Sequence, residues 1–150
     1  MVAQRCRLRH DCIQQFDDGR RLYDDRMFVA PPQIYVETGT SNAAAVDSVT
    51  FFRGPFTLFD PYNLSGDQRT RVILFTSDLG LTQPSPALLS VQAGTTPLTV
   101  EAVGPISGAQ GLTGSYLVVR LPDGLPTGNL SLTLTLGGVT SNATTLSIVP

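Results

Sequence analysis

The alternation of leucine with hydroxyl residues in segment 129–136 constrains the fold of this chain more than any other feature. The sequence there reads NLSLTLTL, with Leu130, Leu132, Leu134 and Leu136 separated by Ser131, Thr133 and Thr135. A period of two places all four leucines on one face of a β-strand and the hydroxyl side chains on the other. One dry and one wet face is typical of an antiparallel sheet that packs a single side against a second layer.

Similar short segments, separated by turn residues, follow one another through most of the chain. They are 33–38, 47–52, 55–60, 69–77, 87–93, 97–104, 115–122 and 144–149. Segment 69–77 is apolar on both faces, which predicts a strand buried on both sides. In 97–104 the alternation predicts Leu98, Val100 and Ala102 on the inward face, and in 115–122 it predicts Leu117, Val119 and Leu121 there.

No sustained helical period occurs between residues 30 and 150, and the glycines of segment 106–114 disfavour the one helical turn that could form. Seven or eight strands with turns every 8–12 residues predict an all-β fold, an immunoglobulin-like antiparallel β-sandwich.

The first thirty residues differ from the rest of the chain in charge. Six of the ten arginines and five of the twelve acidic residues lie there, and the sequence APPQ at 30–33 marks the break. We therefore expect an N-terminal arm over 1–32 and one β-sandwich over 33–150. The sequence predicts that the arm is either an extended segment or a small hairpin around the Asp-Gly pair at 18–19.

Three stretches resemble a known family. They are DQRTRVILFTSDLGL (67–81), PLTVEAVG (97–104) and YLVVRLPDGLPTGNLSLTLTLGGVTSN (116–142). The last carries a spaced pattern of Val119, Pro122, Leu125, Pro126, Gly128, Gly137, Ser141 and Asn142. Together they resemble the C-terminal Ig-like domain, related to the IPT/TIG group, of large secreted proteins of soil bacteria. The resemblance covers about 45–150, and it implies an extracellular or cell-surface module, the C-terminal part of a longer secreted chain, without catalytic residues.

Candidate ligating residues are few. Cys6 and Cys12 could form a local disulfide or remain free thiols. With His10 they would supply only three zinc ligands at an unsuitable spacing, so we expect no metal and no cofactor. The acidic segment 16–25 fails as a calcium loop, since Gln14 and Phe16 occupy the first ligand positions.

The densest aromatic cluster, FFRGPFTLFDPY at 51–62, has two interpretations. Its aromatic side chains could cover the bottom of the core, or they could form a partner-binding surface. The residues concerned are Phe51, Phe52, Phe56, Phe59 and Tyr62.

The inventory of reactive groups argues against an enzyme. The chain has no lysine, its single histidine is His10, and both cysteines lie in the arm, so the usual bases and nucleophiles are absent from the expected sandwich. A net charge of −2 gives no general attraction to nucleic acid, and no apolar run is long enough to span a membrane.

We expect a non-catalytic structural or adhesive module whose partners are other protein domains or copies of itself, with assembly through the N-terminal arm as one version. The alternatives are a carbohydrate-binding-type module, which would bind polysaccharide, or an accessory domain of a secreted hydrolase.

Overall fold

The computed structural model describes residues 30–107 and 113–150, and the described part is all-β. The chain divides between Ala30 and Pro31, two residues before the expected boundary, and Pro31–Pro150 forms one unit. Residues 1–29 of the predicted arm, with Cys6 and Cys12, lie outside the described residues.

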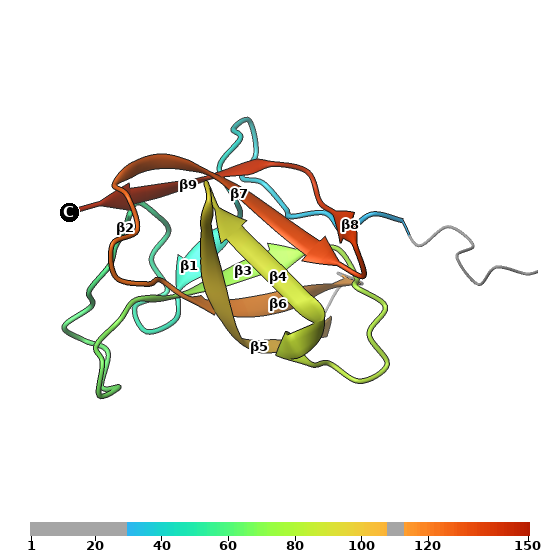
Figure 1. The fold of residues 1–150 in the computed structure, drawn as a ribbon, viewed down its shortest axis with the longest axis horizontal. Coiled ribbons are helices and arrows are strands. Elements are labelled where there is room, and N and C mark those ends of the chain that lie inside the picture. The colour runs from blue at the N-terminus through green and yellow to red at the C-terminus, as the bar shows by residue number, and fades with distance from the viewer. Residues whose placement is uncertain (1–29, 108–112) are drawn as a thin grey trace, which may run out of the picture. The chain divides into compact units, whose positions relative to one another are not determined.

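The described residues of this unit form nine strands and one 3-10 turn (Figure 1). In chain order they are β1 (Ala45–Asp47), β2 (Phe56–Thr57), β3 (Arg71–Thr76), the turn η1 (Pro86–Leu88), β4 (Leu89–Ala93), β5 (Thr96–Ser107), β6 (Thr113–Arg120), β7 (Gly128–Leu136), β8 (Val139–Thr140) and β9 (Thr144–Val149). The spatial order is β1-β3-β6-β5-β4-β7-β9-β2, with β8 paired to β7. Neighbours are antiparallel except β2 and β9, which run parallel.

The strands form two sides that curve almost into a closed barrel (Figure 1). The sides are joined because two segments each pair with strands of both. The start of β5, residues 96–98, pairs with β4, and the remainder of β5 pairs with β6. On the opposite side, Asn42 bridges Thr145 of β9 in parallel, whereas β1, three residues later, pairs with β3. Strands β1, β3, β6 and the second half of β5 therefore form one four-stranded side, and β4, β7, β8 and β9 form the other.

The core lies between these two sides, where the leucine alternation placed it. Leu132 and Leu134 are fully buried, and Leu130 and Leu136 pack against the core from its margins. The predicted inward set of 115–122 is also confirmed, since Leu117, Val119 and Leu121 are fully buried.

Three predicted strands were wrong in detail. Segment 55–60 is a strand only at Phe56–Thr57. Segment 33–38 forms only two isolated bridges, at Ile34 and Val36. Segment 47–52 is a turn rather than a strand, because Asp47 ends β1 and its carboxylate accepts hydrogen bonds from the N–H groups of Val49 and Thr50, both at 2.8 Å.

The inward face of β5 was also predicted wrongly at one position. Its pairing with β6 slips between Val100 and Ala102, so Val100 lies opposite Val119 but Ala102 lies opposite Val118. A β-bulge adds one residue to one strand and reverses the alternation beyond it. Val103 therefore packs on the core, and Ala102 turns outward.

Candidate functional site

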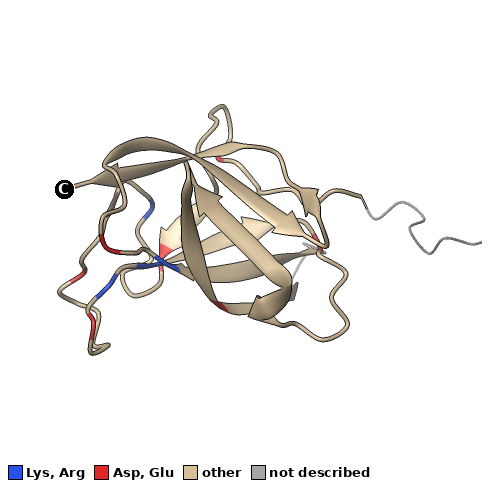
Figure 2. Cartoon of the chain, viewed as in Figure 1, with Lys and Arg blue, Asp and Glu red and all other residues tan. Residues whose placement is uncertain are grey.

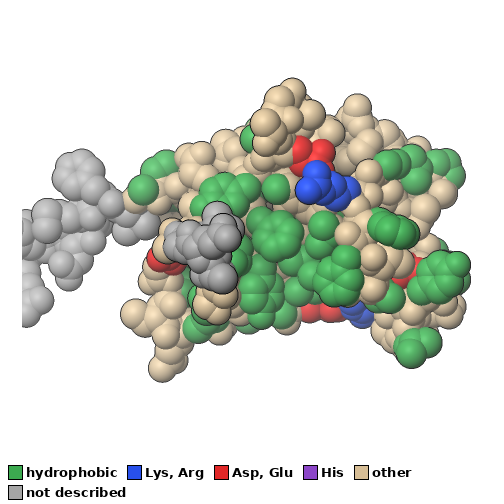
Figure 3. Space-filling view, turned by 180° about the vertical axis from the view of Figure 1, so that it is seen from behind, with side chains coloured by type: hydrophobic (Ala, Val, Ile, Leu, Met, Phe, Trp, Pro, Cys, Tyr) green, Lys and Arg blue, Asp and Glu red, His purple; other side chains and the backbone are tan. Residues whose placement is uncertain are grey.

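The outward side of the four-stranded β1-β3-β6-β5 layer is apolar, although a solvent-facing sheet surface is normally polar. The pairings place Val46, Ile73, Val118 and Ala102 in one row across the four strands. The next row contains Phe75 and Tyr116. These six residues, which we call the outer face, are partly exposed and form a continuous hydrophobic area (Figure 3).

Two glycines make one end of the outer face flat. A Cβ on Gly104 would lie 2.7 Å from the ring of Tyr116, which shows that this ring lies against the backbone of β5. A Cβ on Gly114 would lie 2.6 Å from the backbone oxygen of Thr76, and also near Ile106 Cδ1 at 3.3 Å and Tyr35 Cε2 at 3.4 Å. Side chains that lie down over glycine present a smooth surface, which suits contact with another flat surface.

One flank of the outer face carries a small hollow of about 260 Å³, lined by residues that include Val46 and Phe75. An ion pair lies at its rim, with 3.8 Å between Arg53 Nη1 and Glu37 Oε1. The lining of the hollow is mixed, with apolar residues such as Val46 and Phe75 beside the balanced pair of Arg53 and Glu37.

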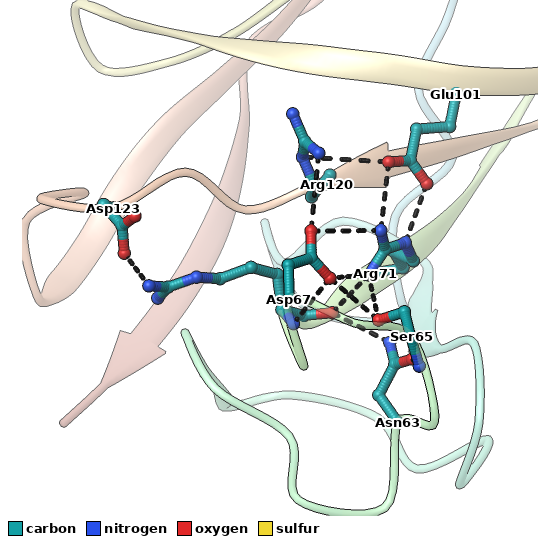
Figure 4. Close-up of polar contacts among 8 residues, drawn as sticks. Asn63, Ser65, Asp67, Arg71, Glu101, Arg120 and Asp123 are labelled. Carbon is teal, nitrogen blue, oxygen red and sulfur yellow. Dashed lines mark hydrogen bonds and ion pairs between the residues drawn. The ribbon is translucent and has the colours of Figure 1, made fainter.

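A network of four charges borders the outer face at one end (Figure 4). Arg71 of β3 donates to Glu101 Oε2 from Nε at 2.8 Å, and to Asp67 Oδ1 from Nη1 at 2.9 Å. Arg120 of β6 lies within ion-pair distance of both acids, at 3.4 Å from Asp67 Oδ2 and 3.7 Å from Glu101 Oε1. Many of the charged residues of the described chain lie toward one end of it, and most strands carry few or none (Figure 2).

Hydrogen bonding perturbs the titration of this network. The Arg71 guanidinium, and then the Ser65 hydroxyl and the Arg69 N–H, hold the pKa of the Asp67 carboxyl well below its usual range. In return, hydrogen bonds to Asp67 and Glu101 raise the pKa of Arg71 above its usual value. Two cations and two anions therefore form a border without net charge, in which each charged group has a partner of opposite charge.

The aromatic cluster predicted as a partner surface is divided by the structure. Phe51, Phe52 and Tyr62 are 67%, 74% and 72% exposed, and Phe59 is also exposed. Phe56 is buried at 6% exposure, because its strand β2 pairs with β9 opposite Ile148 and points the ring into the core. Phe56 therefore belongs to the core, as the first interpretation expects, and the four exposed rings stay candidates for a partner-binding surface.

The exposed members lie in two loops. Phe51 and Phe52 follow the Asp47 turn, and Phe51 has a φ of 59°, a left-handed conformation that a bulky residue rarely adopts. Phe59 and Tyr62 lie in the loop between β2 and β3, where the Arg69 guanidinium is 6.0 Å from the centre of the Phe59 ring. Leu64 of the same loop is 98% exposed.

The acidic residues that could have formed a catalytic pair mostly have structural partners. Asp60 and Asp78 accept hydrogen bonds from the N–H groups of Tyr62 and Gly80 in their own turns, and Asp123 pairs with Arg69. In the described part of the chain, no group of three or more histidine, cysteine or acidic side chains is arranged to hold a metal ion.

The outer face was missed at the sequence level, although a signal for it was present. Segment 69–77 is apolar on both faces, and we interpreted it as a strand buried on both sides. The structure buries Val72 and Leu74 but leaves Ile73 and Phe75 on the outward side, half-exposed. The neighbouring strand β6 also carries apolar residues, Tyr116 and Val118, on its outward side. Apolar residues on both faces of these strands therefore indicate an apolar surface rather than a second core.

Comparison with known proteins adds no relative: no protein-family model matches the chain, and neither a curated protein nor a solved structure matches it. Within the described residues, no helix is both long and apolar enough to cross a membrane.

Proposed function

We propose that this chain is a non-catalytic structural or adhesive module that works by contact through the outer face. The apolar character of that face is the observation that carries the proposal. The largest continuous apolar patch on a soluble monomer is typically about 300–600 Å² and is often a binding site. In an extracellular or cell-surface protein, the setting implied by the resemblance, such a module would join neighbouring protein domains.

The strand connectivity supports the Ig-like part of this proposal. In an Ig domain, strands A, B, E and D form one sheet and C, F and G form the other. Here β1, β3, β6 and the second half of β5 correspond to A, B, E and D, and β4, β7 and β9 correspond to C, F and G. The parallel bridge between Asn42 and Thr145 also fits a first strand that reaches the last one.

The non-catalytic part is tested with the purified full-length chain and a panel of esterase, glycosidase and peptidase substrates. We expect no turnover above that of a buffer blank. Turnover that disappears in Asp60→Asn, Asp78→Asn or Asp123→Asn would overturn the proposal, because it would give one of these carboxylates a catalytic role.

A second candidate, polysaccharide binding, is favoured by the exposed loop that carries Phe59 and Tyr62. Aromatic rings exposed on one loop can stack on sugar rings. The test is retention on insoluble cellulose, chitin and peptidoglycan. Saturable binding that is lost in Tyr62→Ala but kept in Val118→Arg, a change on the outer face, would favour this candidate over contact through the outer face.

A further inference from the structure

We propose that the outer face binds the same face of a second copy of this chain, giving a two-fold symmetric dimer in which the β1-β3-β6-β5 layers pack face to face. This inference rests on the proposed function and names the partner. Four observations on the described residues carry it: the apolar rows, the covered sheet edges, the neutral borders and the size of the patch.

The sheet edges favour a contact between faces over the addition of a strand. The free edge of β9 is occupied by Asn42 at Thr145 and by β2 at Ile148. The free edge of β1 is occupied by the bridge between Val46 and Arg53. Strand addition requires a row of unpaired backbone groups, and these edges are already paired over part of their length.

The second half of β5 has one neighbour, β6, among the described strands. Pro105 lies in this stretch and has no N–H to offer an added strand. The outer face is then the large apolar surface that is left to bind a partner.

The charges around the outer face favour a partner surface that is itself bordered by balanced charges. The network at one end contains Arg71 and Arg120 against Asp67 and Glu101, and the hollow on the flank contains Arg53 against Glu37. Each border is balanced, so neither a polyanion nor a polycation would gain from binding here. A second copy meets this requirement because it presents the same balanced borders.

The size of the patch predicts a weak dimer. Four strands about 4.8 Å apart and two rows about 7 Å apart span roughly 20 Å by 14 Å, or about 300 Å² on each copy. A total of about 600 Å² is well below the usual area of a stable complex, which makes the association weak and reversible. The rings of Phe75 and Tyr116 are consistent with the enrichment of aromatic residues in protein interfaces.

The test is sedimentation velocity on the full-length chain from about 5 µM to about 500 µM, a range that brackets weak association. We expect the sedimentation coefficient to rise with concentration toward that of a dimer. In Val118→Arg the dissociation constant should rise at least about ten-fold, since each copy would bring a charged side chain into an apolar contact. The matched control is Thr133→Arg, a half-buried outward position at the centre of β7 on the opposite side, which should change the constant by less than about two-fold.

A fold control accompanies these variants. Thermal midpoints of both arginine variants are measured first, and Ile73→Thr replaces Val118→Arg if the latter unfolds, because threonine keeps the β-propensity of the position. Ile73→Thr should also weaken the dimer.

A monomer at every concentration, or a dimer that Val118→Arg and Thr133→Arg weaken equally, would overturn this inference. Either result would leave the non-catalytic proposal standing, because that proposal fails only on turnover in the substrate panel.

Discussion

At the residue scale, neighbours in β7 occupy opposite environments. Leu134 is fully buried in the core, and Thr133 faces outward and is only partly covered. Since the alternation has a period of two, a slip of one residue would exchange these environments. A substitution at each position therefore tests the register directly.

We predict that Leu134→Asp abolishes cooperative unfolding, whereas Thr133→Asp shifts the thermal midpoint by only a few degrees. A buried carboxylate without a partner costs several kcal/mol, which is a large share of the stability of a domain this size. Circular dichroism melts of the two variants measure the difference. Equal melting of both would contradict the register.

The aromatic cluster shows where residue-level prediction from sequence ends. Composition identified 51–62 as unusual but could not separate the buried Phe56 from the exposed Phe52. That separation depends on the pairing of β2 with β9, residues far along the chain, and on the turn that Asp47 stabilises. Local alternation carries no information about either.

At the scale of elements, the positions of the strands were predicted better than which of their side chains face the core. Segments 97–104 and 69–77 were both recognised as strands. A bulge in β5 then turned Ala102 outward, and the outward side of β3 proved to be surface. A bulge changes a pairing between two strands, so the sequence of one strand does not reveal it.

The charge network couples the loop before β3 to three strands, and we predict that it makes stability depend on pH. The folded state lowers the pKa of Asp67, so the ionised carboxylate stabilises the fold at pH values above the usual aspartate range, near 4. This stabilisation is lost as the pH falls below about 4 and the carboxylate takes up a proton. In Asp67→Asn the thermal midpoint should therefore drop at neutral pH, and the gap from the unmodified chain should shrink as the solution is acidified.

The control for this prediction is Asp123→Asn. Its ion pair with Arg69 is largely exposed on the carboxylate side, and exposed pairs contribute little. Melting curves between about pH 7 and about pH 2.5 compare the two variants over the range in which carboxylates titrate. If the difference in thermal midpoint between Asp67→Asn and the unmodified chain is the same at all pH values, the pKa of the Asp67 carboxyl does not change on folding.

At the scale of the whole molecule, the all-β class could be predicted, but the closure of the layers could not. Closure depends on contacts between the two ends of the described unit. The side-chain amide of Asn142 accepts from Ile34 N–H at 2.8 Å and donates to Ile34 O at 3.0 Å, across 108 residues. Asn142 was singled out by its place in a spaced pattern, but its partner is determined only by the folded arrangement.

The same contacts predict how much of the N-terminus the fold needs. A chain shortened to begin at Pro31 should keep its thermal midpoint within a few degrees, a change on the order of 1 kcal/mol, because the buried hydrophobic residues of the described unit lie between Ile34 and Ile148. A chain shortened further, to begin at Asn42, removes the buried side chain of Ile34 and leaves the Asn142 amide without its two partners. That chain should melt many degrees lower, since a core side chain and two hydrogen bonds are lost together. Calorimetry on the three chains makes the comparison, and a collapse of stability already at Pro31 would mean that residues before it belong to the folded unit.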